Sequence, residues 1–432
     1  MKLCVVGAGP ASVYLIRELL SRSKDVRIDL FEKQRCTLGH LRYGVAPDQA
    51  GVRATIPVLE KVLESPQVRV FRGVEVGRDL LLSSIQRYYD CVVIGTGADT
   101  PRTLSIPGAR HIAAADALMK RVNGYPNKEN IPIKGTVAVI GNGNVALDVS
   151  RMLLHSEALV ESVPALSGVS ADRVLLIGRG SPDSAKFTVP VLSELYKHPL
   201  STILPARLRD WIESKIASKE PVQRSVRRMI QIVSGGGGGG GGSGRDGRGG
   251  NDRGNDSNGG DSGNNDSGNS DSGNITNTTN TTNTGNTTNT GNLQHSNRSS
   301  AQNNAQSNIL HPNPPTHPTT RPTTHPTKQI ELIFWEEPVA VEKEADSYLL
   351  TTLDDKGTIR TRKLDRIIQA IGYDAQIEGE MLKNVTVPVY KIGWARTGGK
   401  GNLSDALSSS VALSNRLIEQ AAAAPFEAAK TA

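Results

Sequence analysis

The sequence predicts an α/β protein built around two parallel sheets, because one strand–turn–helix pattern occurs twice. Leu3 to Val6 is a short apolar run typical of a buried parallel strand, and it leads into the glycine-rich turn GAGPAS. From Val13 to Leu20, apolar residues recur at helical spacing. The pattern returns at Thr136 to Ile140, where a β-like run leads into the turn GNGNVA and then the helical stretch Val145 to Leu154. Two such units predict two Rossmann-like dinucleotide-binding domains.

The first turn has the spacing of a pyrophosphate-binding loop. Gly7 allows a tight turn, Gly9 allows the backbone to approach a phosphate, and Ser12 stands where Gly or Ala packs the helix on the strand. A second strand, Val26 to Phe31, is followed by Glu32, at the distance where an acidic residue binds a ribose hydroxyl. Glycines alone would also fit an ordinary βα turn, but the complete strand–turn–helix–strand–Glu series favours a dinucleotide site.

The second turn has a cation where the first has an acid. The strand Arg173 to Ile177 ends in Gly178 and Arg179, and an arginine there would accept the 2′-phosphate of NADP. An exposed surface arginine in a loop is the alternative. NADP is the preferred interpretation.

A low-complexity segment interrupts the chain from Ser234 to about Lys328. It contains a run of glycines from Gly235 to Gly242, then Gly/Asn/Asp/Ser, Asn/Thr and Pro/Thr/His repeats. Such a composition has almost no apolar side chains to bury, so a long disordered loop is expected. Its acidic and basic residues balance, so the net charge of +7 belongs to the rest of the 432-residue chain.

Composition excludes several classes of protein. The three cysteines, Cys4, Cys36 and Cys91, form no CxxC pair, which argues against a disulfide scaffold, a zinc site or a dithiol relay, and no metal site is predicted. No apolar run is long enough for a membrane span. The first strand begins at Leu3, so we expect no presequence in the chain as written.

Further strands and one more glycine-rich turn complete the expected folded part. Strands are predicted at Asp90 to Gly97 and at Ile330 to Phe334. A hairpin is predicted at Glu342 to Lys363, and a strand with a turn at Leu364 to Gly372. Gly393 to Ser410 runs from a glycine-rich loop into a helix, which would offer another anion or flavin-edge site beside Trp394.

These residues resemble one family, the adrenodoxin reductase type of NADPH-ferredoxin reductase (NADPH:adrenodoxin oxidoreductase). The resemblance rests on motifs that occur in the family's order and cover nearly all of the chain outside the insert. They are VVGAGPASVY, FEKQ, GVAPD, VEVGRD, GNGNVALDVSRMLL, GRGSPDSAKFT, IGY and GWARTGGKG. Because GVAPD, VEVGRD and GNVALD are not general Rossmann features, this family is favoured over other flavoproteins with two dinucleotides.

The resemblance implies an enzyme that takes a hydride from NADPH onto FAD and passes single electrons to a small acidic iron-sulfur ferredoxin. It also implies a discontinuous FAD domain with an inserted NADP domain. The expected boundaries are 1–105 for the first FAD part, 106–233 and 329–360 for the NADP domain, 234–328 for the disordered insert, and 361–432 for the C-terminal FAD return. Because family members in eukaryotes act in mitochondria, the resemblance also implies a mitochondrial location for this protein, on the matrix side. The oligomeric state is not predicted.

Site residues follow from the resemblance position by position. The FAD set is Gly7, Gly9, Pro10, Ala11, Ser12, Glu32, His40, Val76 and Trp394, with Gly401, Asn402 and Leu403 at the flavin and nicotinamide. The NADPH set is Gly141, Gly143, Asn144, Val145, Arg179 and Glu194. The expected catalytic residues are Asp148, Gln49 and Trp394. For Asp148, a helix-surface aspartate is the alternative.

A basic stretch aligns with the family's ferredoxin-docking surface. It comprises Arg224, Arg227 and Arg228, with Arg207, Arg209, Lys215 and Lys219 upstream. Positive charge there would steer an acidic partner. A solvated helix face is the alternative; nucleic acid is disfavoured because no aromatic platform accompanies the charges.

Several positions depart from the family pattern. Gln49 stands in place of a histidine, and His40 in place of a leucine, where it either bonds to the flavin or fills space. Gly180 replaces a second arginine and Val191 replaces a glutamate, with Glu194 one turn later. These changes leave a second hypothesis, an FAD-binding protein with a degraded NADPH site and a non-catalytic or scaffold role. A glutamate-synthase small-subunit type of reductase is disfavoured because the cysteine cluster is missing.

Overall fold

The computed structural model describes residues 1–126, 132–218, 221–234, 327–375, 379 and 381–423, which lie in one compact unit formed by Met1–Gly240 and Thr324–Ala432. The predicted insert, 234–328, falls outside these residues except at its two ends.

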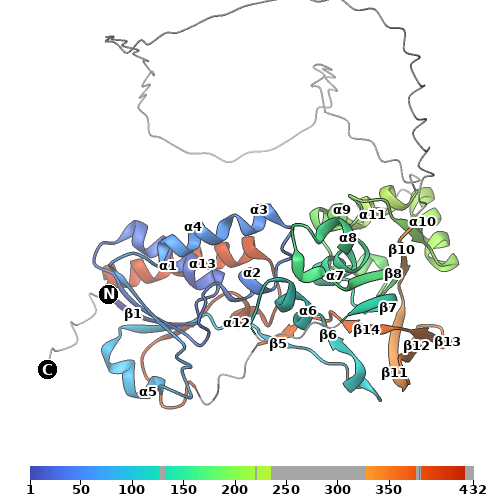
Figure 1. Cartoon of the computed structure of the whole chain (residues 1–432). Coiled ribbons are helices and arrows are strands. Elements are labelled where there is room, and N and C mark those ends of the chain that lie inside the picture. Colours follow the sequence, from blue (N-terminus) through green and yellow to red (C-terminus); the bar gives the residue numbers. More distant parts are fainter. Residues whose placement is uncertain (127–131, 219–220, 235–326, 376–378, 380, 424–432) are drawn as a thin grey trace, which may run out of the picture. The chain divides into compact units, whose positions relative to one another are not determined.

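The first sheet, which contains the strand labelled β1 in Figure 1, is parallel and has the strand order β16-β4-β1-β2-β3. The strands are β16 (Val389–Lys391), β4 (Cys91–Ile94), β1 (Lys2–Val6), β2 (Arg27–Glu32) and β3 (Val68–Arg72). The two central strands, β1 and β4, are almost wholly buried, as expected for a parallel sheet covered on both faces. The strands predicted around residues 3–6, 26–31 and 90–97 are thereby confirmed.

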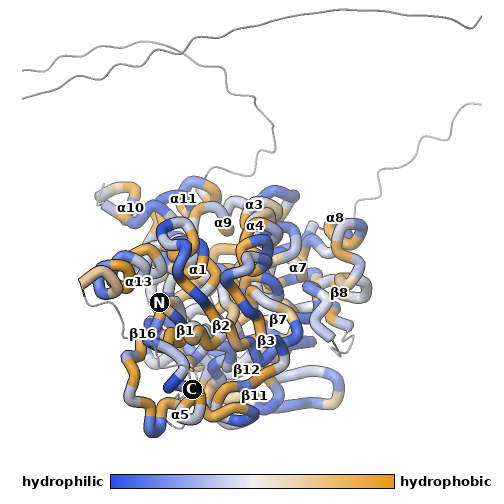
Figure 2. The backbone as a smooth tube through the Cα atoms, turned by 90° about the vertical axis from the view of Figure 1, so that its left-hand side faces the viewer, coloured by the Kyte–Doolittle hydropathy of each residue, from blue (hydrophilic) through white to orange (hydrophobic). Residues whose placement is uncertain are grey.

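Helices α1 (Pro10–Arg22), α4 (Thr55–Val62) and α13 (Leu403–Ala423) pack in one apolar core with this sheet. Hydrophobic and hydrophilic segments alternate along α1 (Figure 2), and its residues 11–16 are all buried, so the first half of this helix is enclosed on every side. The Ser410 hydroxyl of α13 donates to the Ala11 carbonyl of α1 over 2.8 Å. Short helices occupy the connections: α2 (Gly39–Tyr43), α3 (Ala50–Arg53), α5 (Leu82–Ile85) and α12 (Trp394–Thr397).

The second sheet is also parallel, with the order β6-β14-β7-β8-β10-β9. The strands are β6 (Ala113–Ala114), β14 (Arg366–Gln369), β7 (Ile133–Ile140), β8 (Val169–Ile177), β10 (Gln329–Ile333) and β9 (Ser201–Ile203). Its helices are α6 (Ala115–Val122), α7 (Asn144–Leu154), α8 (Ser156–Leu159), α9 (Val189–Leu195), α10 (Ala206–Ser218) and α11 (Arg224–Ser234). Because β10 pairs with both β8 and β9, segments from before and after the insert share one sheet.

The boundary expected at residue 361 lies too early. Strand β14 pairs with β7 and β6 in the second sheet, through Arg366↔Val137 and Ile368↔Ala113. The chain rejoins the first sheet only at β16. An apolar strand shows no partner in its sequence, so the pattern around residue 364 could not reveal which sheet it completes.

Two small antiparallel sheets complete the described residues. The predicted hairpin is a three-stranded sheet of β11 (Glu336–Glu344), β12 (Ser347–Asp354) and β13 (Ile359–Leu364), so the expectation of two strands from Glu342 was too short. Strands β5 (Thr100–Pro101) and β15 (Tyr373–Asp374) pair where the chain leaves the first sheet and returns to it. Among the described helices, none is long and apolar enough to cross a membrane.

Candidate functional site

The first glycine turn follows β1, and its two motif glycines serve different needs. Gly7 has φ +92°, and an added Cβ would lie 2.6 Å from the Gly95 carbonyl oxygen, so the fold itself requires glycine. Gly9 has φ −71°, and an added Cβ would come only within 3.5 Å of that oxygen. Packing therefore does not demand glycine at position 9, which leaves the backbone open to a close ligand.

Helix α1 begins directly behind this turn with uncapped amides. Gly9 is the N-cap and provides no side-chain hydrogen bond, and Pro10 opens the helix. The third motif position, Ser12, is fully buried. A Cβ added at Gly95 would lie 2.0 Å from the Ser12 Oγ, so Ser12 packs directly against a glycine. The free amides and the positive dipole end suit a phosphate group.

Glu32 ends β2 beside the turn, as predicted. Its Oε2 accepts a hydrogen bond from the Ala8 amide at 2.7 Å, and its Oε1 accepts one from the Gln34 amide at 2.8 Å. Burial raises the pKa of this carboxyl, although both amide hydrogen bonds oppose the shift. Because a carboxylate oxygen has a second lone pair, the group can still accept from a ribose hydroxyl.

An aromatic cluster lies near the first turn and joins two predicted residues with one that sequence reasoning did not assign. The His40 ring lies 4.8 Å from the Trp394 ring and 4.9 Å from the Tyr373 ring, centre to centre. The Leu38 amide donates to the Ala8 carbonyl at 2.7 Å, which brings this segment to the turn. Burial lowers the pKa of His40 to about 4, so the ring is neutral at pH 7. Tyr373 belongs to the IGY motif, which was its only signal.

The C-terminal glycine-rich loop is held to the same cluster. Trp394 Nε1 donates to the Gly401 carbonyl at 3.0 Å. The Asn402 side chain accepts from the Ser404 amide at 2.8 Å and so caps α13 before Leu403. Because Asn402 satisfies amides of this helix, the expected anion site at its start is partly filled by the protein's own side chain.

Val76 lies in the apolar cluster on the other face of the first sheet, which also contains Ala395, the residue after Trp394. It is 9% exposed and shares this cluster with Val6, which ends β1, and with Phe31, the residue before the last of β2. The strand ends are where a ligand of this fold approaches.

The second turn repeats the geometry of the first. Gly141 has φ +128°, and an added Cβ would lie 2.3 Å from the Ala370 carbonyl oxygen, whereas a Cβ on Gly143 would meet nothing within 4 Å. Gly143 is the N-cap of α7 and provides no side-chain hydrogen bond. The Asn144 side chain accepts from the Thr188 amide at 2.7 Å, and Val145 packs partly against the core.

A buried charge network connects α7 to the GVAPD segment. Gln49 Nε2 donates to both Asp148 oxygens at 2.9 Å, and Asp48 receives two hydrogen bonds from Arg151 at 2.8 Å. Arg151 also forms an ion pair of 2.9 Å with Asp148. Asp148 is 5% exposed, which excludes the helix-surface alternative. Burial raises its pKa to about 6, while Arg151 and the Gln49 hydrogen bond oppose the shift.

Sequence reasoning missed Arg151. Its position in the α7 pattern is that of an ordinary polar residue, yet the side chain is 2% exposed. Only the partners Asp48 and Asp148, which come from two distant segments, explain why a guanidinium is buried there.

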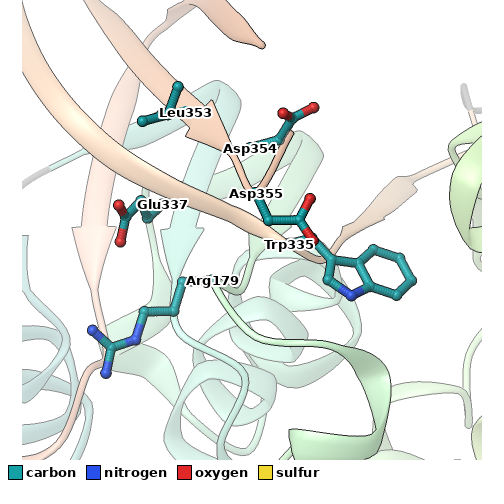
Figure 3. Close-up of a pocket in the computed structure, with 6 residues that line it drawn as sticks. All are labelled: Arg179, Trp335, Glu337, Leu353, Asp354 and Asp355. Carbon is teal, nitrogen blue, oxygen red and sulfur yellow. The ribbon is translucent and has the colours of Figure 1, made fainter. Parts of the chain in front are cut away.

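Arg179 and Glu194, the two predicted charged NADPH residues, lie in different surroundings. Arg179 is exposed and lines an open pocket of about 200 Å³ with Trp335, Glu337, Asp354 and other residues. In Figure 3 its guanidinium points away from Asp354 and Asp355. Glu194 is paired with Lys197 at 2.7 Å on α9, so its carboxylate already has a cationic partner.

The predicted basic stretch divides into paired and free residues. Arg224, Arg227 and Arg228 are exposed on α11, and the structure gives no ion pair for them among the described residues. Arg207 pairs with Asp355, and Lys215 lies 4.0 Å from Asp183. Lys219 falls outside the described residues. Arg209, on α10, is also exposed and has no ion pair among the described residues, so the free charge lies on α11 and at this one position of α10.

The cysteines have no role in either turn. Burial raises the pKa of both Cys4 and Cys91 to about 12, so these thiols stay protonated at pH 7, and Cys36 is free and exposed. Among the described residues, no group of three or more His, Cys, Asp or Glu side chains could hold a metal ion.

Comparison with known proteins gives a consistent result. Residues 1–181 match the family described as pyridine nucleotide-disulphide oxidoreductase. The mitochondrial NADPH:adrenodoxin oxidoreductase of Drosophila melanogaster is 34% identical over 210 residues, 46% of this chain and 45% of the relative. That of Bos taurus is 35% identical over 210 residues, 46% of this chain and 43% of the relative. These alignments span less than half the length of each curated relative.

Among solved structures, FprA of Mycobacterium tuberculosis in complex with NADPH has a TM-score of 0.68 at 19% identity. That comparison covers 100% of this chain and 86% of FprA. At this identity it supports the fold alone, an α/β fold with parallel sheets. The predicted resemblance to the adrenodoxin reductase family and the predicted fold class are both confirmed.

Proposed function

We propose that this relative of the NADPH:adrenodoxin oxidoreductases is itself an FAD-dependent NADPH-ferredoxin reductase. The observation that carries the proposal is the repeated turn: Gly9 and Gly143 each precede an uncapped helix start, and neither is required by packing. Two open turns of this kind suit two dinucleotides. FAD would supply the chemistry, since it accepts two electrons from NADPH and can pass them on singly.

The first turn would hold FAD. The α1 amides and Gly7–Ser12 would bind its pyrophosphate, and Glu32 would accept from its adenosine ribose. Val76 and His40 lie near the strand ends and the turn, and Trp394 with Gly401–Leu403 would close the flavin end. The neutral His40 ring adds no charge to that apolar surrounding.

The second turn would hold NADPH. Gly141, Gly143, Asn144 and Val145 would bind the pyrophosphate, and Arg179 would meet the 2′-phosphate. Glu194 stays a weaker candidate because Lys197 already pairs with it.

Asp148 and Gln49 would lie between the two dinucleotides and orient the reacting rings. An amide cannot titrate near neutral pH, whereas a histidine can. With Gln49 in this place, Asp148 is the group of the pair whose charge changes near pH 6. Arg151 would hold Asp148 in position through the network with Asp48.

A small acidic iron-sulfur ferredoxin is the proposed electron acceptor, docking on α11. Arg224, Arg227 and Arg228 project their charge from this helix without acidic partners among the described residues, which favours electrostatic steering. By the names of its relatives, we propose a mitochondrial location, on the matrix side.

An anaerobic titration tests the proposal. The full chain, reconstituted with FAD and freed of excess flavin, should be yellow, and NADPH should bleach the flavin band faster than NADH. A chain that retains no FAD would contradict the flavoprotein assignment. A yellow chain that neither nucleotide bleaches would instead leave an FAD-binding protein with a degraded NADPH site. Cytochrome c reduction through an added 2Fe-2S ferredoxin, with and without salt, tests the acceptor.

A further inference from the structure

A lysine outside the predicted site lies beside the second turn. The Lys186 amide donates to the Asn142 carbonyl at 3.2 Å, and Lys186 and Gly143 form an isolated parallel bridge. Backbones paired in this way lie about 5 Å apart. The sequence places Lys186 more than forty positions after the turn, so its approach depends on the fold alone.

The neighbours of Lys186 determine the side on which it lies. Ala185 and Phe187 are 5% and 4% exposed and pack in the core of the second sheet, whereas Lys186 is exposed. In an extended segment, alternate side chains point to opposite sides. The segment is also tied to α7, because the Thr188 amide donates to Asn144 Oδ1 at 2.7 Å. Lys186 is therefore kept on the open side, next to the glycine turn.

The charge of Lys186 is not used within the protein. The structure gives its ammonium no ion pair or hydrogen bond among the described residues, in contrast to Lys197, which pairs with Glu194. Space is open at Gly143, where an added Cβ would meet nothing within 4 Å. A flexible ammonium beside an uncapped helix start is well placed to meet an anion in that space.

We propose that Lys186 is a phosphate-binding residue of the second turn, where it binds the pyrophosphate of the pyridine dinucleotide. The proposal rests on the proposed function, which puts NADPH at this turn. Lys186 adjoins Gly143, where a pyrophosphate sits in this kind of unit, whereas Arg179 follows β8, where the ribose phosphate is recognised. Lys186 thus contributes affinity for both nicotinamide dinucleotides, and Arg179 contributes the choice between them.

Equilibrium binding to the FAD-loaded full chain separates these roles. We would measure dissociation constants of NADP⁺, NAD⁺ and adenosine 2′-monophosphate (2′-AMP), which has the 2′-phosphate but no 5′-phosphate, for the unmodified chain, Lys186→Ala and Arg179→Ala. Lys186→Ala should weaken NADP⁺ and NAD⁺ by the same factor, about threefold to tenfold, and leave 2′-AMP unchanged. Arg179→Ala should weaken NADP⁺ and 2′-AMP while NAD⁺ is unaffected.

A matched control is Lys134→Ala, an exposed lysine near the opposite end of β7, which should change none of the three constants. Equal affinities for Lys186→Ala and the unmodified chain would overturn the proposal, as would a loss confined to NADP⁺ and 2′-AMP. If the unmodified chain bound neither NADP⁺ nor NAD⁺, the proposed function itself would fail. If the unmodified chain bound both and Lys186→Ala bound them equally well, only the role of Lys186 would fail.

Discussion

The two glycine turns require nearly the same backbone and differ in the charges on the helices behind them. In each, the first glycine has a positive φ and faces a carbonyl oxygen of a neighbouring chain segment, Gly95 or Ala370. In each, the second glycine stands at an uncapped helix start with room for a ligand. The shared part is therefore backbone geometry, which the pattern of glycines encodes directly.

The two helices show how far the electrostatics diverge. On α1, Tyr14 is buried, and Arg17 is 40% exposed in a surface pair with Glu18. At the corresponding places on α7 are Asp148 and Arg151, both buried; Arg151 pairs with Asp48 of the GVAPD segment, and Asp148 accepts from Gln49, the next residue. The first helix is an ordinary support, whereas the second holds ionisable groups at the place where two distant segments meet. The same glycine motif can therefore be followed by helices whose charged residues differ greatly in burial and in partners.

The largest expected effect tests the shared geometry. Gly7→Ala and Gly141→Ala each force a Cβ into a backbone oxygen at a positive φ, so each should lower the free energy of unfolding by more than about 3 kcal/mol. Urea unfolding followed by circular dichroism measures both. A loss below about 1 kcal/mol at either position would break the equivalence of the turns.

The next effect is peculiar to α7. The folded-state pKa of Asp148 is raised from 3.8 to about 6, so the folded protein binds the proton more tightly than the unfolded chain. Relative to Asp148→Asn, the unmodified chain should therefore lose about 2 kcal/mol of stability as the pH rises from 4 to 6. Urea unfolding of both proteins across this range gives the difference. His40 is present in both proteins, so the effect of its titration cancels in the comparison. A stability difference that does not change with pH would contradict the raised pKa of Asp148.

Glu32, the acid after the second strand of the first unit, and Arg179, the cation at the matching place of the second unit, should contribute unequally to stability. Glu32→Ala leaves the buried amide of Ala8 and the partly buried amide of Gln34 without their acceptor, at a cost of about 2 kcal/mol, and FAD retention should fall with it. Arg179→Ala, at an exposed site, should change stability by less than about 0.5 kcal/mol. Thermal melts and flavin content after gel filtration distinguish the two. Equal destabilisation would show that Arg179 has a structural partner.

Substitution of the second motif glycines, Gly9 and Gly143, should weaken ligand binding and have little effect on the stability of the fold. Because Gly9→Ala and Gly143→Ala meet no close atom and have negative φ, each should change stability by about 1 kcal/mol or less. Gly9→Ala should lose FAD, whereas Gly143→Ala should stay yellow and respond less to NADPH. Retention of normal FAD by Gly9→Ala would mean that the first turn does not hold the pyrophosphate.

The smallest effect concerns the third motif position. Ser12 Oγ is buried without a hydrogen-bond partner among the described residues, so Ser12→Ala should leave the protein equally stable or up to about 1 kcal/mol more stable. The reciprocal change, Ala146→Ser, adds a hydroxyl at a fully buried position and should destabilise. Differential scanning calorimetry of the pair measures both, and a loss of stability in Ser12→Ala would indicate that the hydroxyl has a partner.

Much of the fold was readable from the sequence. The strand ends at Val6 and Ile140 and the place of Glu32 at the end of β2 are confirmed. Both helices are confirmed too, although α1 begins three residues before the predicted Val13 and ends two residues after the predicted Leu20. Each depends on a local signal, an apolar run or a glycine at a fixed offset, that the backbone turns into structure without distant help. The roles assigned to the site residues stay predictions.

The parts that the sequence did not reveal all depend on partners far apart in the chain. Strand β14 joins the second sheet, Arg151 is buried between Asp48 and Asp148, and Lys186 lies beside Gly143. The sequence by itself determined the two turns, their strands and their helices, because these signals are periodic and local. Only the tertiary structure decided which charges meet at the turns, because ion pairs and strand pairing depend on distances in space that no spacing along the chain records.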